Sequence, residues 1–366
     1  MAESFDILSR VHSHFLDLGA YEAVDPPEVL ADRASIPESQ VVKLNGNENP
    51  YGPSPRVMEA LARLDRVHIY PDPQQVALRE AIGHYIGVAS EYVVAGNGSD
   101  EIIDLLFRAL LGPIEGVVNC TPTFGMYSFT AHVVGANTID VPRNDEFQVD
   151  TSKIIKAALK SSKTVVLASP NNPTGNSVPV ADIQRLLEAG LLVIVDEAYA
   201  EFGGESAVHM VAGHHNLVVL RTFSKWAGLA GLRVGYGVMA PALTEILMRV
   251  KPPYNVSQAA EAAVLASLDD LPYIRERVSW MVREKQRLYA LLKDVPGLSP
   301  CPSDANFILC KTPENKGKHV YEALARRGVF VRYFSNPRLQ DYIRISVGTP
   351  ENTDRLMGAL YEALKE

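Results

Sequence analysis

Short apolar runs alternate with amphipathic segments of helix length over much of the chain. β-branched residues dominate the runs 164–168 (TVVLA), 191–195 (LLVIV), 217–220 (LVVL) and 234–239. Nearly continuous apolar runs are typical of strands that are buried on both faces. Between the first two runs, Ile183, Leu186 and Leu187 share one face of a helical segment, 180–189, and Gly190 follows as a C-terminal stop. This pattern predicts a βαβ unit and an α/β fold with a mostly parallel sheet between helices.

The pattern changes after Pro252 and Pro253 to a long helical segment over 257–292, interrupted near Leu271 and Pro272. Beyond it, three short strand-like segments surround a helical one, which predicts a smaller α+β domain. The segments are 306–310, 318–327, 329–333 and 342–347. Prolines and turn residues over 26–55 mark an N-terminal arm. We therefore expect an arm with part of the small domain (1–44), a large domain (45–256) and a linking helix with the C-terminal small domain (257–366).

Composition and charge exclude several classes of protein. The chain has 366 residues and 47% hydrophobic residues, which is ample for a large buried core and far from the composition of disordered proteins. Asp and Glu number 43 against 35 Lys and Arg, and the net charge of −8 disfavours a nucleic-acid surface. A local arginine cluster can still bind a small phosphorylated ligand, because salt screens the more distant charges of the protein over roughly 10 Å.

The cysteines and the apolar segments predict a cytoplasmic location without a membrane partner. Cys120, Cys301 and Cys310 are far apart and odd in number, so neither a disulfide framework nor a zinc site is indicated. Charged residues interrupt 1–18, which therefore does not resemble a signal peptide. The longest apolar run, 191–195 with its small flanking residues, is far shorter than the ~20 residues that a bilayer crossing needs.

Polar residues follow three consecutive predicted strands. Asn172 lies in the loop 169–175 (SPNNPTG), Asp196 and Tyr199 lie in the sequence DEAY, and Lys225 ends the run LVVLRTFSK. Parallel strands bring such residues to one edge of the sheet, where open α/β folds bind ligands. The alternatives are an ordinary turn at 169–175, a structural salt bridge for Asp196 and a solvated surface charge for Lys225.

The residues after Lys225 favour a chemical role for this lysine. Four glycines between Trp226 and Gly237 would allow the backbone to approach a ligand closely, and Arg233 lies among them. A desolvated lysine near other cations has a lowered pKa, which makes its amine a usable nucleophile for Schiff-base chemistry.

A turn into a helix at 96–101 (GNGSDE) predicts an anion site. The apolar positions over 102–110 have helical spacing, so the first N–H groups of that helix would point outward from the turn. The alternative is an ordinary helix start in which Ser99 or Asp100 is only a cap.

These segments together resemble the fold-type I pyridoxal-phosphate aminotransferases, and among them the histidinol-phosphate branch. The resemblance covers nearly the whole chain and rests on seven motifs in family order. They are NGNENPYG (45–52), GNGSDE (96–101), TPTFGMY (121–127), NPTG (172–175), DEAY (196–199), RTFSK (221–225) and YIRISVGT (342–349). The resemblance implies the fold of that family, with 45–256 as the cofactor-binding domain.

The resemblance also implies roles for the residues at the sheet edge. Lys225 would form the Schiff base with pyridoxal phosphate and afterwards shuttle the proton of the substrate. Asp196 would face the pyridine nitrogen and keep it protonated. Asn172 and Tyr199 would donate hydrogen bonds to the phenolic oxygen of the ring. Phe124 would stack on the ring, and its alternative is an ordinary core phenylalanine.

The phosphate and the substrate have their own implied residues. The cofactor phosphate would be bound by Ser99, Asp100, Ser224 and Arg233, and by Tyr51 from a neighbouring subunit, so that two chains complete each site of a homodimer. Arg344 would bind the anionic group of the substrate through its planar guanidinium. Arg332 and Tyr21 match further contacts to the substrate phosphate. A surface salt bridge is the alternative for Arg332.

The expected reaction is amino transfer between L-histidinol phosphate and 2-oxoglutarate in histidine biosynthesis. The alternatives are an aromatic aminotransferase, a threonine-phosphate decarboxylase and a non-catalytic sensor that binds the cofactor. Trp226 departs from the commonest family pattern, and the sequence does not assign this departure an effect on substrate preference.

No metal is expected, because no carboxylate or cysteine framework accompanies the histidine pairs at 12 and 14 and at 214 and 215. The glycines over 228–237 do not match a dinucleotide motif.

Overall fold

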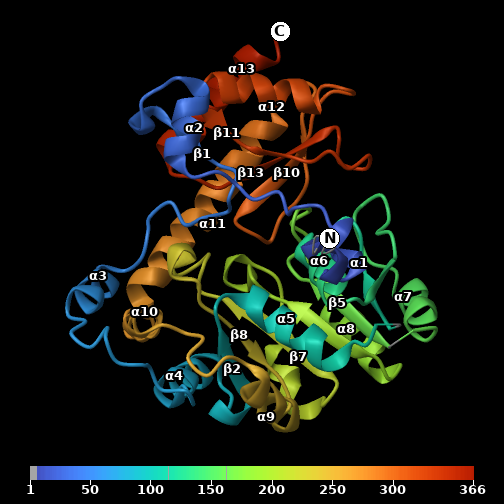
Figure 1. The fold of residues 1–366 in the computed structure, drawn as a ribbon. Coiled ribbons are helices and arrows are strands. Elements are labelled where there is room, and N and C mark those ends of the chain that lie inside the picture. Colours follow the sequence, from blue (N-terminus) through green and yellow to red (C-terminus); the bar gives the residue numbers. More distant parts are fainter. Residues whose placement is uncertain (1–5, 114, 162) are drawn as a thin grey trace, which may run out of the picture.

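The large sheet forms the centre of the lower half of the molecule (Figure 1). The computed structural model describes residues 6–113, 115–161 and 163–366, so 1–5 of the expected N-terminal arm lie outside the described residues. Among the described residues this sheet has seven strands in the order β2-β8-β7-β6-β5-β3-β4. They are β2 (Val93–Gly96), β3 (Gly116–Asn119), β4 (Asn137–Asp140), β5 (Thr164–Ala168), β6 (Leu192–Asp196), β7 (Leu217–Thr222) and β8 (Gly235–Val238).

Most neighbouring strands of this sheet run parallel, which confirms the predicted α/β fold. β8 is the exception, since it is antiparallel to both β2 and β7. β5, β6 and β7 are adjacent and parallel, with Ala168 opposite Asp196 and Asp196 opposite Leu220. The carboxyl ends of these three strands therefore lie side by side, as the spacing of the motifs predicts.

Helices cover both faces of the large sheet. On β6, Val193 and Val195 pack in one apolar cluster with Ile183, whereas Ile194 packs in another with Leu106. This alternation explains why the run LLVIV is apolar at every position. The helices of this part are α3 (Pro55–Ala62), α4 (Val76–Ile86), α5 (Ser99–Leu110), α6 (Met126–Val133), α7 (Thr151–Ala158), α8 (Val180–Glu188), α9 (Pro241–Val250) and α10 (Gln258–Leu268).

A second, smaller layer of strands and helices lies above the large sheet in Figure 1. Its antiparallel sheet has the order β12-β13-β10-β9, and α11 (Leu271–Lys293) links it to the rest. Pro272 lies in the first turn of α11, where a proline is tolerated. The other elements are β9 (Ser299–Pro300), β10 (Phe307–Lys311), α12 (Gly317–Arg326), β11 (Val329–Phe330), β12 (Arg332–Tyr333), β13 (Tyr342–Ser346) and α13 (Pro350–Ala363).

The N-terminal segment packs against both parts of the molecule. β1 (Val42–Lys43) pairs in parallel with β11, which joins the start of the chain to the small domain. This pairing supports the division into 1–44, 45–256 and 257–366, which we retain as a proposal. The remaining elements are α1 (Ser13–Leu16), α2 (Pro27–Ala34) and the 3-10 turns η1 (Ile7–Arg10), η2 (Glu38–Gln40), η3 (Ser90–Tyr92), η4 (Ala200–Phe202), η5 (Val208–Gly213) and η6 (Ala230–Leu232). In the described part of the chain, no helix combines the length and hydrophobicity that a membrane crossing requires.

Two glycines after Lys225 bring distant parts of the backbone together. A Cβ at Gly235 would overlap the backbone nitrogen of Ser99, at the start of α5, and a Cβ at Gly228 would lie 2.6 Å from the backbone of Gly52. From the sequence, we expected these glycines to allow close approach of a ligand. The structure corrects this: at both positions the close neighbour is the chain itself.

We expect Gly235→Ala to destabilise the protein by about 1–3 kcal/mol, because the added methyl group meets backbone atoms that cannot rotate away. Urea unfolding measures the change. Gly358→Ala is the matched control, because this glycine lies in α13 with no atom within 4 Å of the new methyl group. It should leave the free energy of unfolding unchanged or raise it by up to ~1 kcal/mol. Equal stability of the two variants would contradict the close approach at Gly235.

Candidate active site

A cavity of about 1000 Å³ lies at the carboxyl ends of β5, β6 and β7. Residues from the large sheet, the small domain and the N-terminal segment 17–24 line it. Every predicted site residue except Tyr51 lies on its wall. These residues are Tyr21, Ser99, Asp100, Phe124, Asn172, Asp196, Tyr199, Ser224, Lys225, Arg233, Arg332 and Arg344.

Tyr51 lies outside this cavity. Its ring packs edge-on against Trp280, with ring centroids 5.4 Å apart, and the guanidinium of Arg277 lies 5.9 Å from the Tyr51 ring. Arg277 also stacks on Trp280 at 3.8 Å. Within one chain, Tyr51 therefore belongs to an aromatic cluster, and its contact with a neighbouring subunit stays a prediction.

Lys225 follows β7, and its side chain lines the cavity. Its Nζ donates a hydrogen bond to the carbonyl oxygen of Gly46 at 3.2 Å. Burial lowers the pKa of Lys225 to about 8, and the positive charge of Arg344 acts in the same direction. A substantial fraction of this amine is therefore neutral near neutral to mildly basic pH, as a nucleophile requires.

Asp196 ends β6 and is buried. Its partners are two hydrogen-bond donors: the Tyr127 hydroxyl donates to Oδ2 at 2.7 Å and the Ala198 N–H donates to Oδ1 at 3.1 Å. Burial raises the pKa of Asp196 to about 6, and these two hydrogen bonds oppose the increase. Among the described residues no lysine or arginine pairs with it, so the structural salt bridge considered for Asp196 is not what the structure shows. Tyr127 ends the motif TPTFGMY (121–127), but no role was predicted for it.

Tyr199 is oriented by a residue from the start of the chain. Asn47 donates a hydrogen bond from Nδ2 to the Tyr199 hydroxyl oxygen at 3.0 Å, and Ser346 donates to Asn47 Oδ1 at 2.8 Å. Because the Tyr199 oxygen already accepts from Asn47, its own proton is free to be donated into the cavity. Sequence reasoning missed Asn47, whose only signal was the motif at 45–52.

Arg344 joins the small domain to the loop after β5. Its guanidinium donates to Asn172 Oδ1 at 2.5 Å and to the Asn45 carbonyl at 2.6 Å. Because the Asn172 oxygen accepts from Arg344, the amide nitrogen is the group left to donate toward a ligand. The buried Nε of Arg344 has no hydrogen-bond partner among the described residues. Burial lowers the pKa of Arg344 to about 10, so the side chain is still a cation at neutral pH.

The start of α5 forms a cluster of hydrogen-bond donors. Gly98 precedes the helix with φ of 82°, and no side chain caps the first N–H groups. Ser99 and Asp100 therefore do not act as the caps that were weighed in the sequence analysis. Arg233 pairs with Asp100 at 3.0 Å and lies 3.5 Å from the Ser224 hydroxyl. Free N–H groups, a hydroxyl and a guanidinium together suit a phosphate group.

The N-terminal segment closes the opposite side of the cavity. The ring of Tyr21 meets Phe124 edge-on, with centroids 6.2 Å apart. Arg332 donates to the Glu22 carbonyl at 2.8 Å and pairs with the Glu22 carboxylate at 3.3 Å. The salt bridge weighed for Arg332 is thus present, although Arg332 also lines the cavity.

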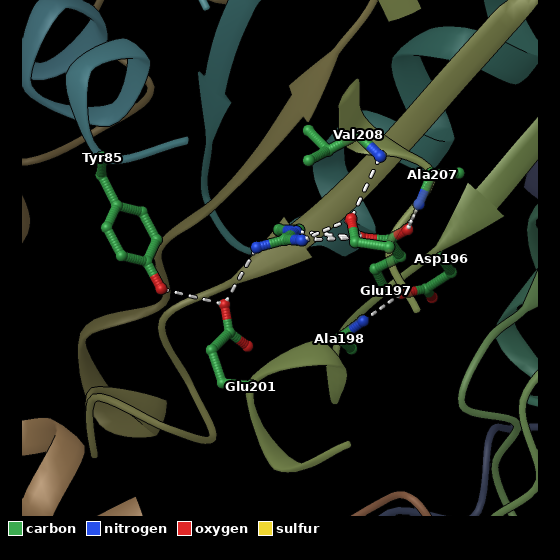
Figure 2. Close-up of polar contacts among 9 residues, drawn as sticks. Tyr85, Asp196, Glu197, Ala198, Glu201, Ala207 and Val208 are labelled. Carbon is green, nitrogen blue, oxygen red and sulfur yellow. Dashed lines mark hydrogen bonds and ion pairs between the residues drawn. The ribbon is translucent and has the colours of Figure 1, made fainter. Parts of the chain in front are cut away.

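A buried polar network supports the turns that carry these residues, as Figure 2 shows. Arg221 on β7 donates to Glu197 at 2.9 Å, to Glu201 at 3.3 Å and to Ser206 at 2.7 Å. Tyr85 donates to Glu201 at 3.4 Å. Glu197 directly follows Asp196, and Arg221 lies four residues before Lys225. The network therefore ties the turn after β6 to the strand that leads to the lysine.

The donor set of the cavity fits pyridoxal phosphate. It offers an amine for the aldehyde, a buried carboxylate for the ring nitrogen, two donors for the phenolic oxygen and an uncapped helix start for the phosphate. Hydrogen bonds within the protein orient several of these groups: Lys225 donates to Gly46, Asp196 accepts from Tyr127, and Tyr199 accepts from Asn47. A single cofactor with these four functional groups would use all of them.

Comparisons with known proteins agree with this chemistry. The family model for aminotransferase class I and II matches residues 39–360. A histidinol-phosphate aminotransferase from Roseiflexus castenholzii is 46% identical over 94% of this chain and 95% of its own length. A chloroplastic one from Arabidopsis thaliana is also 46% identical, over 96% of this chain and 85% of its own length. The crystal structure of histidinol-phosphate aminotransferase from Sinorhizobium meliloti in complex with pyridoxal-5'-phosphate superposes with a TM-score of 0.89, at 25% identity over 99% of both chains.

In the cofactor-free protein, we expect an aromatic aldehyde to label Lys225 at half its maximal rate near pH 8. Only the neutral amine attacks, so the rate rises as the pH passes the pKa of about 8. Borohydride trapping followed by peptide mapping measures the rate at each pH. Arg344→Gln should move the midpoint to higher pH, because it removes a positive charge near the amine. A midpoint near the ordinary lysine value of 10.5, or a label on another lysine, would contradict the assignment.

Proposed function

The chain belongs to the class I and II aminotransferases, and from that membership we propose that it moves an amino group between L-histidinol phosphate and 2-oxoglutarate. The products are imidazole acetol phosphate and L-glutamate, and the reaction belongs to histidine biosynthesis. The observation that carries this proposal is the 46% identity, over 94% of the chain, to a histidinol-phosphate aminotransferase, combined with a cavity that holds Lys225 and Arg344 together.

Pyridoxal phosphate, when bound, supplies a conjugated ring that withdraws electrons from the substrate. Lys225 would bind the cofactor through Nζ and afterwards move the proton of the substrate Cα. Asp196 would hold a proton on the ring nitrogen. The amide nitrogen of Asn172 and the hydroxyl of Tyr199 would donate to the phenolic oxygen and so orient the ring.

The other end of the cofactor would lie at the start of α5. The phosphate would be bound by the backbone N–H groups of Ser99 and Asp100, the hydroxyl of Ser224 and the guanidinium of Arg233. The carboxylate of Asp100 would repel an anion on its own, but it is paired with Arg233 and so fixes the guanidinium in place. Phe124, which lines the cavity beside Tyr21, would cover the cofactor ring.

Arg344 would bind the anionic groups of both substrates. Histidinol phosphate has no α-carboxylate, whereas 2-oxoglutarate has two carboxylates, so one guanidinium serves a phosphate monoester in one half-reaction and a carboxylate in the other. Arg332 and Tyr21 would contact only the phosphate. An aromatic aminotransferase would use the same cofactor-binding residues. The two activities differ in the expected effect of replacing Arg332, which should weaken the reaction of the phosphorylated substrate more than that of phenylalanine.

Arg344→Lys should lower kcat/KM for both histidinol phosphate and 2-oxoglutarate by about 10- to 100-fold, because it keeps the charge but loses the planar fork. Arg332→Gln should penalise histidinol phosphate about tenfold more than phenylalanine. Steady-state kinetics with the three substrates measures both effects. Arg338→Gln is the control, because this arginine lies near the cavity without lining it. A wild-type kcat/KM for phenylalanine equal to that for histidinol phosphate would assign the protein to the aromatic aminotransferases.

We also propose a cytoplasmic homodimer with shared active sites. An exposed apolar patch supports a dimer: Val67 and Tyr70 are 74% and 76% exposed, Ile69 is half exposed, and Tyr70 stacks on the exposed ring of Tyr254 at 4.4 Å. Solvent-exposed apolar clusters of this kind are typical of interaction sites. The contribution of Tyr51 to the phosphate of the neighbouring subunit rests on the family resemblance. All three cysteines are free thiols, as a reducing compartment would maintain them.

We expect Ile69→Asp to shift the protein toward monomers and to lower activity, because a buried, unpaired charge at an interface is costly. Analytical ultracentrifugation with parallel activity assays over a range of protein concentrations measures both. Leu159→Asp places the same charge on an equally exposed leucine at the end of α7 and should change neither. A wild-type monomer, or an Ile69→Asp dimer as stable as the wild type, would contradict this interface.

A further inference from the structure

Asp196 receives hydrogen bonds on both carboxylate oxygens, but the two donors differ in kind. The Ala198 N–H is a backbone group of the turn after β6, so the donor does not depend on the side chain at position 198. The Tyr127 hydroxyl comes from α6, on another part of the chain, and donates at 2.7 Å. Tyr127 has no exposed surface.

The surroundings of Asp196 disfavour its negative charge. Desolvation is the largest effect that raises the pKa of Asp196, and the charges of Asp100 on α5 and of Glu197 in the same turn add to it. Tyr127 and the Ala198 N–H oppose the increase. Tyr199 is a further titratable neighbour of Asp196: burial raises the pKa of its hydroxyl to about 12, and the charge of Asp196 adds to the increase, so the hydroxyl stays neutral. Tyr127 is thus the side chain that favours the ionised carboxylate.

We propose that Tyr127 is a positioning residue of the amino-transfer reaction, which holds the Asp196 carboxylate ionised and aimed at the ring nitrogen of pyridoxal phosphate. The inference rests on the proposed function. One hydrogen bond fixes Oδ2, the Ala198 N–H fixes Oδ1, and together they define the plane of the carboxylate. Asp196 would then present an acceptor that is already oriented toward the ring nitrogen.

The ring of Tyr127 also contacts Phe124. The two rings meet edge-on, with centroids 5.6 Å apart. A single side chain therefore supports both the residue that would pair with the ring nitrogen and the residue that would cover the ring. Tyr127→Phe removes the hydroxyl and retains this aromatic contact, so the variant separates the hydrogen bond from the packing.

The test compares the affinity of the protein for pyridoxal phosphate with its affinity for the 1-deaza analogue, in which carbon replaces the ring nitrogen. The wild type should prefer pyridoxal phosphate, because only its ring nitrogen can share a proton with Asp196. In Tyr127→Phe this preference should fall about tenfold, a typical effect of losing a hydrogen bond to a charged group. Equal preference in the two proteins would overturn the proposal.

The dependence of this preference on pH gives a second readout. The preference should vanish as the pH falls and Asp196 becomes protonated, and the midpoint should lie at higher pH in Tyr127→Phe because the carboxylate has lost a donor. Tyr85→Phe is the matched control, since it removes a hydroxyl that donates to Glu201 and not to Asp196. It should leave both the preference and the midpoint as in the wild type. A midpoint that moves equally in Tyr85→Phe would also overturn the proposal.

Kinetics separates this inference from the proposed function. Tyr127→Phe should lower kcat while the KM for histidinol phosphate changes little, because the ring nitrogen acts after the substrate has bound. If Tyr127→Phe does not fold, 3-fluorotyrosine at position 127 provides a stronger donor and should move the midpoint of the preference to lower pH. A wild-type protein that binds the cofactor but does not transfer amino groups would refute the proposed function, while the affinity comparison would still decide the role of Tyr127.

Discussion

The negative charge of Asp196 at the end of an apolar strand is the constraint on which the site depends. The strand is apolar on both faces because it lies in the centre of the sheet, so the carboxylate has little access to water. A buried charge needs compensation, and the chain provides two hydrogen-bond donors in place of a cation. The side of the carboxylate that faces the cavity therefore remains available for a cationic ligand group, which is what a protonated pyridine ring would offer.

Other contacts of the site join parts of the chain that are far apart in sequence. Arg344 on β13 holds the oxygen of Asn172, which follows β5, and Ser346 on the same strand holds Asn47, which orients Tyr199. The small domain therefore sets the orientation of donors that lie in the large domain. Because the proposed substrate would bind at Arg344, the groups that orient the cofactor are coupled to the group that recognises the substrate.

The sequence predicted those features that depend on local pattern. The apolar runs predicted β5, β6, β7 and β8, although not β2, β3 and β4 of the same sheet. The order of the motifs placed Asn172, Asp196 and Lys225 at one edge, because parallel neighbouring strands must end together. The partners of these residues could not be predicted in the same way. Tyr127 lies 69 residues from Asp196, and Asn47 lies 152 residues from Tyr199, so only the packing of the helices and loops brings them into contact. The role of the glycines after Lys225 also depends on such distant contacts. They were expected to allow close approach of a ligand, whereas Gly228 and Gly235 lie against the backbone of Gly52 and Ser99.

We propose that Asp196 keeps a proton on the ring nitrogen of bound pyridoxal phosphate, so that the ring can withdraw electrons during amino transfer. The most direct measurement is the ¹⁵N chemical shift of the protein loaded with cofactor labelled at the ring nitrogen, recorded between pH 7 and 8. We expect the shift of a protonated pyridinium in the wild type and that of a neutral pyridine in Asp196→Ala. A neutral pyridine shift in the wild type would contradict it.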